Sequence, residues 1–321
     1  MKKLFVFYLL VLKVVFWLSS CNKKNEITVE EQAISSSDAT TFREETDQVL
    51  NEVSNYLENT TFGGARLDGS VDSISVTALD GNGGATTATA YPSQKKLVLS
   101  FVNADSKDGQ RKRSGKIVVQ LDTTSNKPKN WNEPNAELMV YFQSLKITRN
   151  SDGKFIIING TKRVRNITGG RAIHALLTLG STKVVHEITG NISVTFEDGT
   201  QRNWSLFRKR EFEYQKITLL STRNDNVTEE GVNRFGNNFI TSISVPVVLK
   251  RLNCNTKYQV RVVDGRLTHQ VGNKTNSIEF GFNALGNRPI EDCQKTSVKI
   301  RFINRRNQPT ELILTMYRNN L

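Results

Sequence analysis

The chain has 321 residues, 37% of them hydrophobic, and its 44 basic and 31 acidic side chains give a formal net charge of +13. This length supplies one large domain or two ordinary domains with a real core. The positive charge favours polyanionic partners, although a charged surface kept for solubility is the alternative. For an exported protein the expected polyanions are lipid phosphates and acidic glycans, and not nucleic acid.

The first 20 residues predict a cleaved leader. Met1-Lys2-Lys3 precedes an apolar run from Leu4 to Leu18, and small residues follow before Cys21. A charged start, a short apolar core and small residues at the cut site are typical of export signals. The apolar run contains Lys13 and is shorter than the roughly 20 residues that a membrane-spanning helix needs. Segment 1–20 is therefore predicted to be a signal peptide and not a membrane span.

The junction Leu18-Ser19-Ser20-Cys21 resembles the lipobox of bacterial lipoproteins, in which an aliphatic residue and two small residues precede a cysteine. The resemblance implies cleavage before Cys21 and its acylation, and a membrane partner held through that lipid. A plain secretory signal with a stray cysteine is the alternative. Directly after the cysteine stands Asn22 and not Asp, and in this the chain resembles lipoproteins that are sent to the outer membrane. Lys24-Asn25-Glu26 is only faintly similar to the acidic tag that directs some lipoproteins to the cell surface. The predicted location is the outer membrane, on either its periplasmic or its surface face.

The segment after the anchor is acidic. Loss of the three leader lysines lowers the net charge from +13 to +10, and residues 26–58 hold nine acids against Arg43 alone. The Ser-rich segment 21–40 predicts a polar tether. Segment 41–58 predicts an amphipathic helix, with apolar residues at helical spacing and a capping box of Thr41 and Glu44. We expect its apolar stripe to pack on the body, while its acidic face could meet the basic body or a partner.

The rest of the chain predicts an all-β body of antiparallel strands, in meandering sheets or sandwich-like modules. Asp152-Gly153, Asn159-Gly160, Asp198-Gly199 and Asp264-Gly265 predict tight turns. Stretches beginning at Gly115, Gly190 and Gly265 are 75 residues apart each time, which suggests modules at 60–149, 150–224 and 225–321, or else chance spacing. The predicted strands are Ser73–Leu79, Lys96–Val102, Lys116–Leu121, Glu137–Ile147, Lys154–Ile158, Ile192–Phe196, Asn203–Phe207, Ile240–Leu249, Tyr258–Val263, Ser277–Phe282, Val298–Ile303 and Glu311–Met316.

Two cysteines remain once Cys21 carries lipid. In an oxidising envelope Cys254 and Cys293 predict a disulfide, which closes a loop of about 40 residues worth roughly 4 kcal/mol in the chain-entropy model. A metal site is the alternative, but the sequence has no CxxC spacing that would support it.

Several stretches between residues 95 and 303 resemble a group of uncharacterised β-rich lipoproteins from Bacteroidetes-type bacteria. Asp108-Gly109 with Gly115-Lys116-Ile117-Val118 is similar to one motif of that group, and Gly160-Thr161-Lys162-Arg163 with Asn166 is similar to a second. Thr195-Phe196-Glu197-Asp198-Gly199-Thr200 followed by Trp204-Ser205 and Arg208 is similar to a third. Leu252-Asn253-Cys254 and Asp292-Cys293 echo a paired-cysteine final module, with a longer insert after Phe280. The resemblance implies the fold and the anchor, and it implies no catalytic residue.

No catalytic motif stands out. The nucleophile elbow GxSxG, the P-loop and the zincin motif HExxH are absent. A carboxylate pair for glycan hydrolysis is recognised by distance in space, so body acids remain formal candidates: Glu137, Glu197, Glu211, Glu213 and Glu279. Strand alternation favours a charge ladder for Glu211, Glu213 and Lys209 instead. We predict no enzyme, no cofactor and no metal.

Basic clusters are the stronger signal for binding: Arg111-Lys112-Arg113, Lys162-Arg163 with Arg165, and Arg208-Lys209-Arg210. Guanidinium groups bind phosphate or carboxylate, and aromatic faces stack on sugars. The candidate ligand-binding residues are Arg163, Arg165, Trp204, Arg208 and Arg210. The expected partner is an anionic glycan or an outer-membrane protein complex to which this chain is an accessory subunit. Core packing for Trp204 and edge protection for the arginines are the alternatives.

Overall fold

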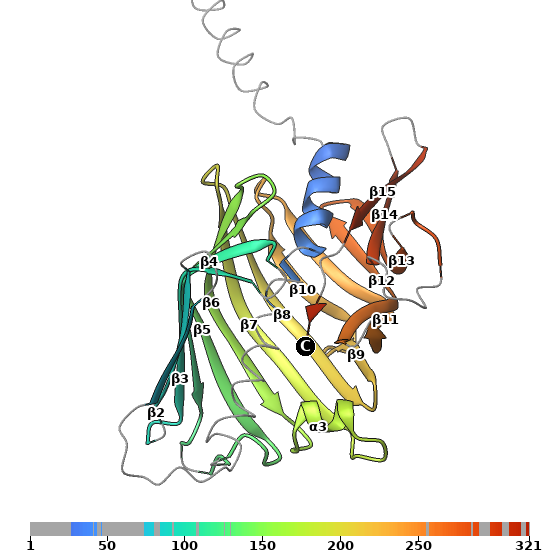
Figure 1. Ribbon diagram of the computed structural model, residues 1–321. Coiled ribbons are helices and arrows are strands. Elements are labelled where there is room, and N and C mark those ends of the chain that lie inside the picture. Colours follow the sequence, from blue (N-terminus) through green and yellow to red (C-terminus); the bar gives the residue numbers. More distant parts are fainter. Residues whose placement is uncertain are drawn as a thin grey trace, which may run out of the picture.

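The computed structural model is a single antiparallel sheet that curls into an open trough (Figure 1). The structure describes residues 27–40, 42–43, 46, 74–79, 84–91, 93–106, 109–124, 126–128, 130–254, 257–283, 285–288, 296–303, 308–315 and 319–320. Within these residues no helix is long and apolar enough to span a membrane. The prediction of an all-β antiparallel body is confirmed.

The strands follow one another across the sheet in chain order. Two short strands, β9 and β10, share the place between β8 and β11, and β16 pairs with β12. The elements are β1 (Ile74–Leu79), β2 (Ala85–Tyr91), β3 (Lys96–Asp105), β4 (Arg111–Leu121), β5 (Ala136–Arg149), β6 (Phe155–Asn166), α3 (Ala172–Leu177), β7 (Val184–Phe196), β8 (Gln201–Glu213), β9 (Lys216–Ser221), β10 (Val227–Val232), β11 (Asn238–Cys254), β12 (Lys257–Val271), β13 (Lys274–Asn283), β14 (Thr296–Ile303), β15 (Pro309–Thr315) and β16 (Asn319–Asn320).

The sheet is continuous across the boundaries at which we predicted separate modules. Strand β5 pairs with β6 across the boundary at 149/150. Strands β8 and β9 pair with β10 and β11 across the boundary at 224/225. Of the two architectures predicted, the structure therefore has the meandering sheet and not sandwich-like modules.

Glycines inside the strands allow the sheet to bend. Gly115, Gly190 and Gly265 lie within β4, β7 and β12 at φ values of 112°, 155° and 131°. At Gly115 an added Cβ would lie 2.3 Å from the backbone oxygen of Ser144 on β5, so only glycine lets the two strands approach this closely. Such in-strand glycines are a means of curving a sheet. The 75-residue spacing thus marks three bending points of one sheet.

Two of the four predicted turns also lie inside strands. Asn159-Gly160 is in β6 and Asp264-Gly265 is in β12, whereas Asp152-Gly153 and Asp198-Gly199 do connect strands. Gly160 has a φ of 120°, and an added Cβ would meet the Asn191 oxygen of β7 at 2.3 Å. An Asn-Gly or Asp-Gly dipeptide tolerates positive φ equally in a hairpin turn and at a bend within a strand. That shared tolerance explains the error.

The N-terminal helix begins earlier than predicted. Residues 29–40 are helical, as are 42, 43 and 46. A capping box precedes them: the Thr28 amide donates to Glu31 Oε2 at 2.8 Å, and the Glu31 amide donates to Thr28 Oγ1 at 3.1 Å. The prediction of a tether over 21–40 is therefore wrong from residue 29 onward. Thr41, Glu44 and 47–58 of the predicted helix lie outside the described residues.

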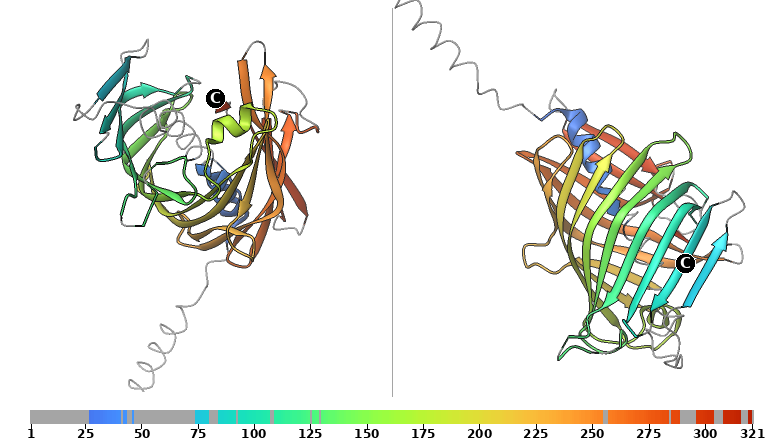
Figure 2. Two further views of the ribbon diagram at one scale, coloured as in Figure 1. Left: turned by 90° about the horizontal axis from the view of Figure 1, so that it is seen from below. Right: turned by 90° about the vertical axis from the view of Figure 1, so that its left-hand side faces the viewer.

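The helix lies on the concave face of the trough (Figure 2). Apolar side chains around it form two clusters. One joins Phe42 to strands from β2 to β8, with Phe239 and Val271. The other joins α3 to β9 and to strands from β11 to β14, with Val29 and Ala33 packed against it. The helix contacts both clusters and so ties the two halves of the sheet together.

Candidate binding site

The helix meets the sheet through polar side chains. Ser35 and Ser36 are both 0% exposed. Ser35 Oγ lies 3.0 Å from His269 Nε2 on β12, and Asn276 of β13 donates to Ser36 Oγ at 2.8 Å. A Ser-rich run is ordinarily taken for a solvated linker, but here the hydroxyls of Ser35 and Ser36 both have buried partners, which offset the cost of their burial.

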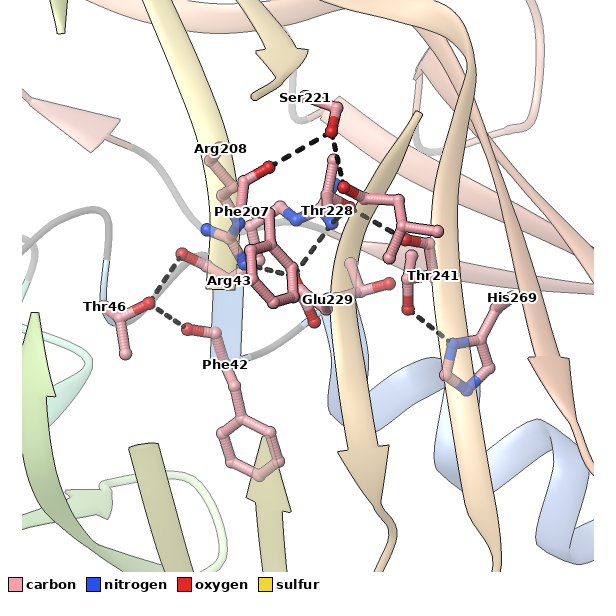
Figure 3. Close-up of polar contacts among 12 residues, drawn as sticks. Phe42, Arg43, Thr46, Phe207, Arg208, Ser221, Thr228, Glu229, Thr241 and His269 are labelled. Carbon is pink, nitrogen blue, oxygen red and sulfur yellow. Dashed lines mark hydrogen bonds and ion pairs between the residues drawn. The ribbon is translucent and has the colours of Figure 1, made fainter. Parts of the chain in front are cut away.

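One buried carboxylate holds three arginines, two of which, Arg43 and Arg208, are labelled in Figure 3. Glu229 of β10 pairs with Arg43 of the helix at 2.9 Å, with Arg202 of β8 at 3.8 Å, and with Arg208 of β8. Burial by itself would raise the pKa of Glu229. The attraction of Arg208, Arg43 and Arg202 outweighs burial and lowers the pKa to about 2. Glu229 is therefore a fixed anion that joins the helix to the middle of the sheet.

Arg202 is fully buried beneath the helix. Its guanidinium carbon lies 3.9 Å from the centre of the Phe239 ring, and its Nη1 donates to the Ser35 carbonyl at 3.3 Å. Burial lowers its pKa to about 10, so it stays charged at neutral pH. Stacking on rings and carbonyl contacts replace part of its lost hydration.

His269 continues this polar network as a neutral side chain. Its Nδ1 lies 2.9 Å from Thr241 Oγ1 on β11, in addition to the Ser35 contact at Nε2. Burial, with the nearby Arg202, lowers the pKa of His269 to about 3. One ring nitrogen donates and the other accepts, with the hydroxyls adapting to either tautomer.

An ion pair between Asp38 and Arg234 joins the helix to one end of the trough. Arg234, in the turn between β10 and β11, donates to both carboxylate oxygens of Asp38 at 2.9 and 2.8 Å. Its guanidinium also stacks on Phe196, 3.2 Å from the ring centre. Burial raises the pKa of Asp38, and Arg234 opposes that rise. Bidentate pairing with stacking is a geometry that arginine provides and lysine does not.

A cavity of about 220 Å³ opens beside this pair. Its walls carry four cations and two carboxylates around an apolar surface, so the lining has an excess of positive charge. The lining residues are Ser37, Asp38, Phe42, Arg111, Ile147, Arg149, Lys154, Phe155, Ile156, Phe196, Glu197 and Arg234. Cationic side chains over an apolar floor suit an anionic group that carries an uncharged portion.

The five residues predicted to bind ligand do not form one surface. Arg163 and Arg165 lie on the outer face, 50% and 44% exposed at the side chain, and both approach Glu137. Trp204, Arg208 and Arg210 are buried on the concave side, where Trp204 stacks on Phe42 with ring centres 5.7 Å apart. The alternation of side chains turns Arg163 and Arg165 of β6 outward. In β8 it turns the other three residues inward. The core alternative for Trp204 is confirmed.

The concave face carries a further row of buried cations. Arg111 and Arg113 of β4 and Lys162 of β6 are buried, as are the three arginines of β8. Lys162 Nζ donates to the Thr46 carbonyl of the helix at 3.4 Å. Alternation within Arg111-Lys112-Arg113 could have identified two of these inward side chains. The Asp38 and Arg234 partnership has no signal in the sequence, because it joins residues 196 positions apart.

The described residues do not test the predicted disulfide, and they contain no metal site. Cys254 ends β11, where Lys257 is its cross-strand partner. Cys293 lies outside the described residues, among which no disulfide is seen, so the pairing stays a prediction. No group of three or more His, Cys, Asp or Glu side chains within the described part of the chain could hold a metal ion.

Comparisons with protein-family models, with curated proteins and with solved structures find no match to this chain. The resemblance to Bacteroidetes-type lipoproteins therefore rests on the short motifs alone, and a function is inferred from the predicted anchor and from the trough.

Proposed function

We propose that this protein is a non-catalytic, lipid-anchored component of the bacterial outer membrane that binds an anionic ligand on the concave side of its sheet. The observation that carries the proposal is the position of the helix. It starts at residue 29, eight residues after the cysteine of the lipobox, and its polar side is seated among buried cations. The anchor thus leads directly into the binding face.

The cavity beside Asp38 and Arg234 supports an anionic ligand better than the outer face does. Arg163 and Arg165, the exposed candidates for a glycan, are both near Glu137, which Lys127 also approaches at 2.9 Å. Burial opposes the shift, but Lys127 and Arg163 together lower the pKa of Glu137. A ligand on the outer face would have to displace an established charge cluster. We therefore assign binding to the cavity.

A non-catalytic role is supported by the surroundings of the acids that were formal candidates for hydrolysis. Each has a basic partner within 4 Å: Glu137, Glu197, Glu211, Glu213 and Glu279. Lys183 and Lys209 lower the pKa of Glu211 against burial, and Lys216 lowers that of Glu213. A general acid needs a raised pKa, which is the opposite condition. The charge ladder predicted for Glu211, Glu213 and Lys209 is present.

Metabolic labelling with an alkyne analogue of palmitate, followed by separation of the membranes, tests the anchor. The wild-type chain should carry the label and sediment with the outer membrane. The variant Cys21→Ser should lose both the label and the membrane association. Labelling that persists in Cys21→Ser would refute the anchor, and with it the location.

Exposed apolar side chains favour a second candidate, an accessory subunit of an outer-membrane complex. Leu285, Ile303 and Ile313, around the last hairpins of the sheet, are 81%, 50% and 41% exposed. Exposed apolar side chains gathered in one region can mark a protein interface. Affinity purification of the lipidated chain in detergent, with mass spectrometry, should then recover a stoichiometric partner. Leu285→Asp should abolish that recovery, and recovery of the chain alone would exclude this candidate.

A further inference from the structure

The cavity lies at the end of the trough where the helix begins. Four of the turns at this end define what we call the proximal rim: residues 150–154, 197–200, 233–237 and 272–273. Lys154 and Glu197 join two of the turns at 3.7 Å, and Arg234 reaches Phe196 from a third. Ile27, just before the helix, packs against Gly272 in the fourth. The opposite end, with α3 and the turn before β9, is the distal rim (Figure 1).

The anchor places the proximal rim next to the membrane. Ile27 lies six positions after Cys21 in the chain. An extended chain spans at most about 3.5 Å per residue, so Ile27 lies within about 21 Å of the lipidated sulfur. Because Ile27 touches the rim itself, the mouth of the cavity stays within reach of the lipid headgroups. This placement rests on the proposed function, and specifically on the lipidation of Cys21.

The outermost cations of the cavity can exchange their partners. The side chains of Lys154 and Arg149 are 61% and 42% exposed, and their partners Glu197 and Asp152 are each 39% exposed. Ion pairs this exposed contribute little, so an incoming anion can replace them at small cost. Deeper in the cavity, Phe196, Ile147 and Ile156 offer an apolar wall. The arrangement matches a phosphate group with a glycerol or acyl portion behind it.

We propose that the cavity at the proximal rim binds the phosphate-bearing headgroup of an anionic lipid in the membrane that anchors the protein. Arg149 and Lys154 meet the phosphate at the mouth, and Arg234, held by Asp38, adds positive charge behind them. The lipid anchor and the headgroup site then fix the trough upright, with its distal rim pointing away from the bilayer.

Vesicle flotation of the exported chain carrying Cys21→Ser tests this site, because no acyl chain then holds the protein to the vesicle. The chain should float with vesicles of phosphatidylcholine and phosphatidylglycerol and should not float with phosphatidylcholine alone. Arg149→Gln with Lys154→Gln should weaken binding about thirtyfold, since each basic residue near an anionic surface contributes roughly a factor of five. Lys183→Gln with Lys216→Gln, the same charge change at the distal rim, should leave binding within about twofold.

The outcomes separate the site from its alternatives. Equal loss in both double variants would overturn the proposal, because diffuse charge would then explain the binding. Glycerol 1-phosphate should compete at constant ionic strength. If it binds while neither type of vesicle does, the ligand is a free phosphate ester and not a lipid. Absence of all binding, together with palmitate labelling at Cys21, would overturn the headgroup site while leaving the anchored protein intact.

Discussion

At the scale of single residues, the interior depends on charges whose partners are fixed. Glu229 is 1% exposed and holds arginines from the helix and from β8. Taking such a group out of water is costly, and removing one partner strands the others without compensation. The same geometry explains why sequence patterns identified the basic clusters and not their roles. Alternation predicts which arginines share a face, and only the fold decides which face is the inside.

Replacing the buried carboxylate should destabilise the protein severely. Glu229→Gln keeps the shape and removes the charge that holds three arginines, so we expect a loss of about 3–5 kcal/mol in the free energy of unfolding. Urea titration followed by circular dichroism measures it. Glu311→Gln is the matched control, because Glu311 pairs with Arg301 at 2.7 Å on the exposed surface and its loss should cost far less. Equal losses would show that burial of Glu229 contributes nothing.

The buried histidines should lower the free energy of unfolding in mild acid. Burial lowers the pKa of His269 and of His186 to about 3 from 6.5, so below pH 6.5 the unfolded chain takes up protons that the folded chain refuses. Stability therefore falls as the pH drops from 6.5 towards 3. At pH 5 each histidine should account for about 2 kcal/mol relative to pH 7.5. In urea titrations His269→Gln should reduce this pH dependence, and an unchanged dependence in this variant would contradict the prediction.

At the scale of elements, most strands could be predicted and the irregular ones could not. All 12 predicted strands overlap strands of the sheet, because β-branched runs between turn residues are a strong signal. Four strands were missed: β2, β9, β10 and β16. Strand β9 was overlooked although it alternates, as KITLLS. Strand β2 reads ATTATAY, and β10 reads VTEEGV with two acids and a glycine. Neither carries an apolar alternation, and tertiary pairing overrides their weak propensity. The early start of the helix was missed for a related reason, since its first turns bury polar side chains such as Gln32, Ser35 and Ser36.

The in-strand glycines should not tolerate a side chain. Gly160→Ala would put a Cβ 2.3 Å from the Asn191 oxygen on the neighbouring strand, so we expect a loss of several kcal/mol or a failure to fold. Gly199→Ala is the control. Gly199 also has a positive φ, at 81°, but an added Cβ there would meet nothing within 4 Å, so its cost should be about 1 kcal/mol. Thermal unfolding of both variants measures the difference, and similar melting temperatures would contradict the bending role.

At the scale of the whole molecule, the sequence predicted an all-β fold, and the structure shows that its strands form one continuous sheet. Turn spacing and the absence of interleaved helices were enough for an antiparallel body. A single sheet, in place of three modules, follows from pairing across every boundary, which no local pattern encodes. The cavity depended on the same long-range information. Its walls come from the helix and from strands β4, β5, β6 and β7, brought together only by the curvature of the sheet.

Whether the predicted disulfide forms tests whether the protein resides in the oxidising cell envelope. Cys254 ends a long strand of the C-terminal half, and its pairing with Cys293 is expected in an oxidising envelope. Peptide mapping of the exported protein without reductant should recover the two cysteines in one linked peptide. Cys254→Ser should lower the unfolding free energy by roughly 4 kcal/mol in the chain-entropy model. Two alkylated free thiols in the exported protein would contradict the prediction.

The seating of the helix also sets an order of events in time. Ser35 and Gln32 find their partners at His269 and Asn276, 234 and 244 positions later in the chain. The helix precedes every strand of the sheet in the chain, so it can dock only after most of the chain has followed it. Contacts this distant in sequence form late in folding. If acylation of Cys21 occurs on export, the membrane holds one end of the chain before the trough closes around the helix, and the last step of maturation takes place at the bilayer surface.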